Sequence, residues 1–169
     1  MSIQYRELGT GLLKVLAYGS AVSTYILILI GGYVTTSNSG TACGSGPGFD
    51  SWPSCNGALF PNLSNPAQAI EYSHRVFTLV VAFFVIGTVL LAWTRHRSAK
   101  NVVLFSTASL VGLFAQVILG MVTVTSDLNP VVSAAHLGLA SAVFALVVVN
   151  AVMVWNLRSV PVEVSTIVM

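Results

Sequence analysis

The stretch IEYSHRVFTLVVAFFVIGTVLLAW (residues 70–93) decides the fold, because it is long and almost entirely apolar after its first six residues. Between Arg75 and Arg95 the chain contains no ionisable side chain. A helix that crosses a bilayer needs about 20 such residues. The stretch therefore predicts a transmembrane helix whose first turns carry Glu71, His74 and Arg75.

Three further apolar stretches, at residues 12–34, 102–124 and 131–155, are each long enough to cross a bilayer. Of the 169 residues, 55% are hydrophobic and only 7% are charged, against about 25% charged in a soluble domain. We therefore predict an all-α integral membrane protein, with residues 1–169 forming one domain folded as a four-transmembrane-helix bundle. The net charge of +2 is too small to indicate a nucleic-acid partner.

The basic residues predict how the chain is oriented in the membrane. Six of the seven lysines and arginines fall near the chain termini or in the segment 94–101, and only Arg75 falls on the other side. Short loops that carry positive charge stay in the cytoplasm. We therefore expect a multi-pass protein of the cell membrane, with both termini cytoplasmic and the long loop 35–69 outside.

Both cysteines of the chain, Cys43 and Cys55, lie in the loop 35–69. The outer side of the membrane is oxidising in most cells, so we expect a disulfide between them. Closing a loop of this size would stabilise the fold by about 3 kcal/mol. A redox-active pair is the alternative, although the Cys-x-x-Cys spacing of many such pairs is absent.

A short internal repeat relates the two halves of the chain. LIGGYVTTS (residues 29–37) ends the first predicted helix and ILGMVTVTS (residues 118–126) ends the third, with a glycine, a threonine and a serine aligned. A histidine follows in the first turns of the next helix in each half, at His74 and His136. The pattern predicts two helix–loop–helix repeats in the same orientation, related by an axis along the membrane normal. Chance similarity between apolar segments is the alternative.

The two histidines are expected at nearly the same depth in the outer leaflet. His74 and His136 each lie about one turn inside a helix that is predicted to run inward. Two imidazoles at one depth in a helix bundle can bind one haem iron from opposite faces. The alternative is that each histidine is an isolated polar residue satisfied by a neighbour. We predict that His74 and His136 are the axial ligands of a haem iron.

Three more polar residues extend this predicted haem site. Glu71 lies one turn before the first histidine and is placed to accept a proton, while Arg75 is placed to pair with a haem propionate. An i,i+4 ion pair at the membrane interface is the plainer interpretation of these two residues. Gln116 lies in the third helix between two glycines at four-residue spacing. That stripe fits either the close approach of a flat ligand or ordinary packing of small residues.

Taken together, these motifs resemble the haem A synthase family. EYSHR (residues 71–75) is similar to the family's Glu-x-x-His-Arg motif, and GSGPGFDSWPSCNG (residues 44–57) is similar to its outer cysteine loop. QVILGMVTV (residues 116–124) and AHLGLA (residues 135–140) resemble its third and fourth helices. The similarity covers about residues 29–145.

The resemblance implies that the chain oxidises the methyl group at ring position 8 of haem O to a formyl group, and so makes haem A for terminal oxidases. It implies that His74 and His136 hold the haem iron and that Glu71 assists proton or water chemistry at the methyl carbon. Cys43 and Cys55 would form the outer disulfide. Haem O or haem A would occupy the site as substrate or product, with haem B as a further candidate.

The chain has one four-helix half, whereas typical members of the family have eight spans in two halves. We therefore expect a homo-oligomer, and we expect haem O synthase and the assembly of terminal oxidases to be further partners. Three other functions stay open: a b-type cytochrome, a quinone-dependent disulfide-generating enzyme, and an assembly subunit of an oxidase. The cytochrome would need both histidines but not Glu71, and the disulfide-generating enzyme would need a second cysteine pair.

Overall fold

The structure is a computed structural model that describes residues 2–157, with side chains described from residue 10 onward. It contains four α-helices: α1 (Ser2–Thr36), α2 (Pro66–Arg95), α3 (Lys100–Thr125) and α4 (Pro130–Trp155). Each includes one of the four expected spans and is long and apolar enough to cross a membrane. Within residues 2–157 no strand is present, so the predicted all-α membrane bundle is confirmed.

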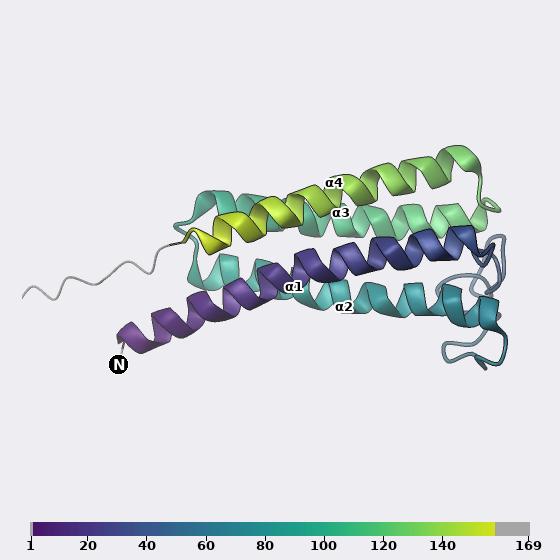
Figure 1. Ribbon diagram of the computed structural model, residues 1–169, viewed down its shortest axis with the longest axis horizontal. Coiled ribbons are helices and arrows are strands. Elements are labelled where there is room, and N and C mark those ends of the chain that lie inside the picture. The colour runs from purple at the N-terminus through teal and green to yellow at the C-terminus, as the bar shows by residue number, and fades with distance from the viewer. Residues whose placement is uncertain (1, 158–169) are drawn as a thin grey trace, which may run out of the picture.

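The four helices run up and down side by side (Figure 1). α1 packs against α2 and α4, and α3 packs against the same two helices. The loop between α2 and α3 lies at the end of the bundle where α1 begins, and we call this the α2–α3 end. The other two loops lie at the opposite end, which we call the long-loop end. Which end faces the cytoplasm, and whether the halves are true repeats, stay predictions.

α2 and α4 begin in the same way, at an Asn-Pro pair. The side chain of Asn65 accepts a hydrogen bond from the backbone N–H of Ala67, and the side chain of Asn129 accepts hydrogen bonds from those of Val131 and Val132. The following proline occupies the first helical turn, where its missing N–H would have had no partner. Both helix starts lie at the long-loop end. The caps therefore define where the two helices that carry the histidines begin.

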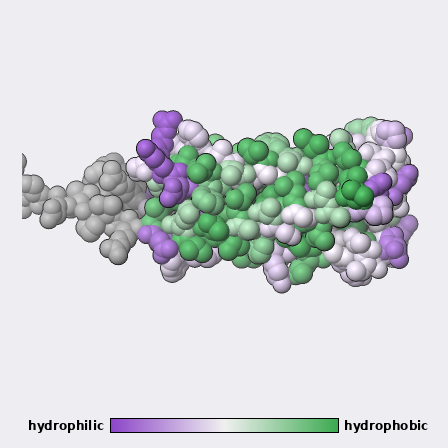
Figure 2. Space-filling view, turned by 90° about the horizontal axis from the view of Figure 1, so that it is seen from above, coloured by the Kyte–Doolittle hydropathy of each residue, from purple (hydrophilic) through white to green (hydrophobic). Residues whose placement is uncertain are grey.

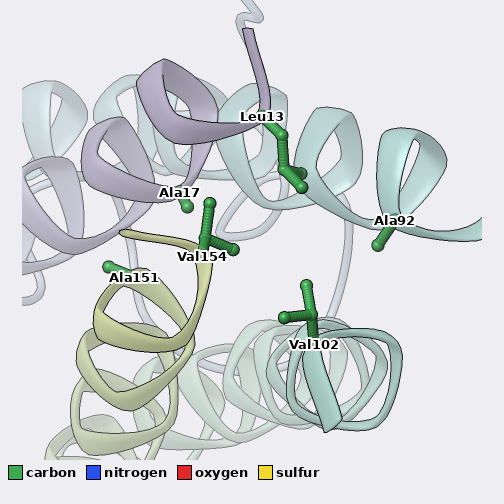
Figure 3. Packing of buried hydrophobic residues seen from close by; sticks show 6 residues of the cluster. All are labelled: Leu13, Ala17, Ala92, Val102, Ala151 and Val154. Atoms are coloured by element: carbon green, nitrogen blue, oxygen red, sulfur yellow. The ribbon is translucent and has the colours of Figure 1, made fainter. Parts of the chain in front are cut away.

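Two clusters of buried hydrophobic side chains fill the bundle. The first lies near the α2–α3 end and receives side chains from all four helices (Figure 3): Leu13, Ala17, Ala92, Val102, Ala151 and Val154. The second lies closer to the long-loop end and is made by Val81, Val85, Leu113 and Val147. These clusters hold the two helix pairs together and leave the histidine turns between the second cluster and the long loop.

The outer surface of the bundle is mostly hydrophobic. In the view of Figure 2, hydrophobic residues cover the length of the helices, and hydrophilic residues gather at the two ends. Many large apolar side chains face outward along the helices; Leu79, Phe83 and Phe114 are among them. A soluble protein rarely exposes so much continuous apolar surface, whereas a bilayer covers it.

Candidate functional site

The loop between α1 and α2 is closed by the expected disulfide between Cys43 and Cys55. Both cysteines are fully buried, at 0% and 1% exposed. Reactive cysteines lie in partly exposed positions, because a thiolate must reach the sulfur that it attacks. Burial of this pair therefore favours the structural interpretation of the disulfide over the redox-active one.

Glu71 and Arg75 join this loop to α2. The Oε2 atom of Glu71 accepts a hydrogen bond of 2.8 Å from the backbone N–H of Cys43, and its Oε1 atom is paired with Nη2 of Arg75. The Nη1 atom of Arg75 donates to the backbone carbonyls of Ser51, at 2.7 Å, and of Ser54. Glu71 is only 3% exposed, so its charge is balanced inside the protein by the guanidinium. We call these two side chains with their backbone partners the loop clamp.

The loop clamp can be compared with the two interpretations of Glu71 and Arg75 from the sequence, an ion pair or a proton acceptor with a propionate partner. The i,i+4 ion pair is present. Both carboxylate oxygens and both terminal nitrogens of the guanidinium already have protein partners. The proton-transfer role of Glu71 and the propionate contact of Arg75 therefore stay predictions, and the contacts themselves hold the loop against the first turns of α2.

Each of the two histidines lies against a glycine of the neighbouring helix. His74 of α2 faces Gly31 of α1, where an added Cβ would lie 3.0 Å from Cε1 of the imidazole ring. His136 of α4 faces Gly120 of α3, where an added Cβ would lie 3.2 Å from Cε1. Both distances are shorter than ordinary contacts between carbon atoms. The two glycines therefore leave the space in which the imidazole rings lie.

The two imidazoles come from different helix pairs, since His74 of α2 lies against α1 and His136 of α4 lies against α3. The Nδ1 atom of each ring is buried without a hydrogen-bond partner. A buried imidazole nitrogen without a partner is unfavourable, and coordination to a metal is one way to satisfy a histidine ring. Among residues 10–157, no group of three or more His, Cys, Asp or Glu could hold a bare metal ion. An iron carried by a macrocycle would take two axial ligands from the protein, so ligation of a haem iron by His74 and His136 stays a prediction.

Gln116 and the glycines on either side of it all face α4. The Nε2 atom of Gln116 donates a hydrogen bond of 3.1 Å to the backbone carbonyl of His136. A Cβ added to Gly112 would lie 2.7 Å from Cγ2 of Val143. Helix packing therefore accounts for Gly112, Gly120 gives space to the histidine ring, and Gln116 holds the backbone of the His136 turn. The predicted contact of Gln116 with a cofactor stays a prediction.

Some parts of the site could not be found from the sequence, and others left a signal. The loop clamp uses the backbone N–H of Cys43 and the carbonyls of Ser51 and Ser54, and backbone groups are present at every residue. The glycines under the rings did leave a signal, because Gly31 and Gly120 align in the short repeat. Their contact with the histidines was nevertheless not predicted.

Comparison with known proteins bears on the family of this chain. Residues 64–167 match the COX15-CtaA family, described as cytochrome oxidase assembly protein. The chain is 33% identical to a Heme A synthase from Bacillus pumilus (strain SAFR-032) over 144 residues, which are 81% of this chain and 44% of that protein. It is 30% identical to a Heme A synthase from Lysinibacillus sphaericus (strain C3-41), over 85% of this chain and 45% of that protein. No solved structure matches significantly.

The matched regions agree with the expected resemblance and contain most of the site. The chain spans less than half the length of these relatives. The family match includes the whole of α2, α3 and α4, and with them both histidines, Gln116 and the charged pair of the loop clamp. Because the family match covers more than half of the chain and includes both histidine-bearing helices, the chain belongs to the COX15-CtaA family of cytochrome oxidase assembly proteins.

Proposed function

We propose that this chain acts as a haem A synthase, oxidising the C8 methyl group of haem O to the formyl group of haem A. The observation that carries the proposal is the pair His74 and His136, each lying on a glycine and each with a buried nitrogen that has no hydrogen-bond partner. The relatives named Heme A synthase support the same reaction.

His74 and His136 would bind the two axial positions of the haem iron. Neutral imidazole nitrogens are standard axial ligands, and the two rings approach from opposite helix pairs. A haem held there would supply the iron centre for oxygen and one-electron chemistry. The glycines would keep the rings in place, because any larger residue at either position would press on the imidazole. The experiment described below identifies which haem, O, A or B, is bound in the purified protein.

Glu71 would be the carboxylate that takes up a proton released as the methyl group is oxidised. Both of its oxygens are hydrogen-bonded in the loop clamp, so one of those partners must be exchanged before Glu71 can accept a proton. Until then Glu71 acts as a positioning residue, which holds the disulfide loop against the turn that carries His74. Arg75 would reach a haem propionate only after releasing the carbonyls of Ser51 and Ser54.

A b-type cytochrome is the second candidate function, and the loop clamp is the observation that favours it. An electron-transfer protein needs both histidines as ligands but needs no base beside the iron. Because the clamp occupies Glu71 and Arg75, the two imidazoles are left without a free acid or base from the EYSHR motif. The two functions differ in one product: only a synthase forms haem A.

The experiment is to express the chain in a host that makes haem O, purify it in detergent, and identify the extracted haem by chromatography and mass. We expect haem A from the wild type, and no bound haem from His74→Ala or His136→Ala. We expect unreacted haem O or an alcohol intermediate from Glu71→Gln. Ser73→Ala is the matched control, because Ser73 is the exposed neighbour of His74. Haem B alone, unchanged in Glu71→Gln, would contradict the synthase and leave the cytochrome.

We also propose that copies of this chain associate into a homo-oligomer, and that they meet haem O synthase and the assembly machinery of a terminal oxidase. The apolar faces of the bundle are covered by lipid or by another membrane protein in either case. Mass measurement of the detergent-solubilised protein tests self-association, and a mass of one chain at all protein concentrations would contradict it. Co-purification with the tagged chain tests the other two partners.

A further inference from the structure

A groove of about 380 Å³ opens at the α2–α3 end, where the last turn of α2 meets the first turns of α3. It is lined by Trp93, Arg97, Lys100, Val103, Leu104 and Thr107. The lining combines two cations, an indole ring and an apolar wall. None of these residues belongs to the histidine site or to the loop clamp, which lie near the opposite end of the bundle.

Trp93 and Arg97 are held in place at the rim of this groove. The indole N–H of Trp93 donates a hydrogen bond of 3.0 Å to Oγ1 of Thr107, which ties the ring from α2 to α3. Cζ of Arg97 lies 5.6 Å from the centroid of the Trp93 ring, within the range of a cation–π contact. The ring therefore orients the guanidinium while leaving its N–H donors available to a ligand.

No carboxylate in the described part of the chain balances the two cations of the groove. The only ion pair found among residues 10–157 is that of the loop clamp. The other two acids whose side chains are described, Asp50 and Asp127, also lie at the long-loop end. α3 begins at Lys100 without a side-chain cap, so the positive end of its dipole adds to the charge of Arg97 and Lys100. An anion is the ligand that this charge pattern favours.

The groove also continues into the apolar surface of the bundle. Leu104 is 62% exposed, and together with Val103 it forms a wall on the side of the groove toward the middle of α3. Trp93, at 44% exposed, lies near the end of α2, at the level where indole rings gather at a bilayer surface. A free phosphate would satisfy the cations and leave this wall uncovered. An anion that carries an acyl chain fits both parts of the groove.

We propose that this groove binds an anionic phospholipid of the leaflet at the α2–α3 end. Arg97 and Lys100 bind the headgroup phosphate, Trp93 packs on the glycerol region, and Leu104 packs on the upper acyl chain. Basic pockets at helix ends are the usual place for such headgroups, and each cation that lines the groove should strengthen binding about fivefold. The inference does not depend on the haem reaction.

The test measures which lipid lies beside Trp93. Trp52→Phe and Trp155→Phe together leave Trp93 as the single tryptophan of the chain. The protein is placed in vesicles of phosphatidylcholine with a minor fraction of phosphatidylglycerol, and bromine is carried either by the phosphatidylglycerol or by an equal amount of the phosphatidylcholine. Net charge and bromine content are then identical, so the difference in quenching of Trp93 reports lipid selection alone.

We expect stronger quenching by the brominated phosphatidylglycerol, and a loss of about fivefold in this preference for each of Arg97→Gln and Lys100→Gln. Arg95→Gln is the matched control, because it removes the same charge from the same region but does not line the groove; its preference should stay near the wild-type value. Arg97→Lys keeps the charge and should keep the preference, and Lys100→Gln carries the test if Arg97→Gln does not fold. Circular dichroism verifies the fold of each variant.

Three results would overturn the proposal. Equal quenching by the two brominated lipids would show no selection at Trp93. A loss in Arg95→Gln as large as in Arg97→Gln would assign the effect to general surface charge. Disappearance of the preference in inorganic phosphate, but not in chloride at equal ionic strength, would show a site for free phosphate in place of a lipid.

Discussion

The two halves of the bundle present a histidine in the same way and differ beyond it. In each half the ring lies on a glycine of the preceding helix. The first half then carries a long loop held by a disulfide and by Glu71 and Arg75, whereas the second half has a tight turn ending at Asn129. At the positions that match Glu71 and Arg75 relative to the histidine, the second half has Ser133 and Leu137.

This difference teaches what the charged pair does. A histidine on α4 is placed without any acid or base in its own turn, so Glu71 and Arg75 are not needed to hold an imidazole. They occur where a long loop must be attached to the helix, and apart from their own ion pair their hydrogen bonds are with that loop. The comparison predicts that substitutions in the loop destabilise only the first half. Substitution of the glycine under the ring should destabilise each half in the same way, Gly31 the first and Gly120 the second.

The largest expected effect comes from breaking the disulfide. Cys43→Ser with Cys55→Ser removes a cross-link that closes a loop with a sequence separation of 12, which should lower the free energy of unfolding by about 3 kcal/mol. Chemical denaturation in detergent measures the change. Reductant should destabilise the wild type but leave the double variant unaffected. An unchanged denaturation midpoint in the double variant would mean that the clamp alone holds the loop.

The next largest effect is expected from Glu71→Gln. The variant leaves the guanidinium of Arg75 without its counter-charge in a site that is largely buried, so we expect a loss of about 2 kcal/mol and faster proteolysis of the loop. Ser133→Ala, at the matching position of the second half, should change stability by less than about 0.5 kcal/mol. Similar losses in both variants would break the proposed difference between the halves.

The glycine under each ring offers a smaller and more local test. Gly31→Ala places a methyl group 3.0 Å from the ring of His74, and we expect a loss of about 1 to 2 kcal/mol in stability. The absorption spectrum of the haem that we propose to bind there should shift as well. Gly120→Ala, at 3.2 Å from His136, should cost slightly less. Gly32→Ala has open space around it and should stabilise α1 by up to about 1 kcal/mol. Equal behaviour of Gly31→Ala and Gly32→Ala would contradict the contact with His74.

The smallest effect is expected at Gln116. Gln116→Leu removes the hydrogen bond to the backbone carbonyl of His136, which should lower stability by about 1 kcal/mol. The effect should be confined to the second half, so the rate of loop proteolysis in the first half should stay unchanged. Faster proteolysis of the loop in Gln116→Leu would show that the two halves are energetically linked through the histidines.

Much of the fold could be predicted because it depends on patterns that are local in the chain. The four helices contain the four predicted spans, since a run of about 20 apolar residues has few other folds available in a membrane. The disulfide was predictable because the chain has only two cysteines and both lie in the same loop. The helix starts at Pro66 and Pro130 follow asparagine caps that are visible in the sequence.

The sequence by itself determined the membrane class, the spans, the cysteine pair and the residue types available for the candidate site. Only the tertiary structure decided which groups these residues contact. It assigned the carboxylate of Glu71 to the N–H of Cys43 and the guanidinium of Arg75 to the carbonyls of two serines. The physical reason is that backbone N–H and C=O groups are present throughout the chain, so their choice as partners depends on where the loop folds and leaves no mark in the sequence.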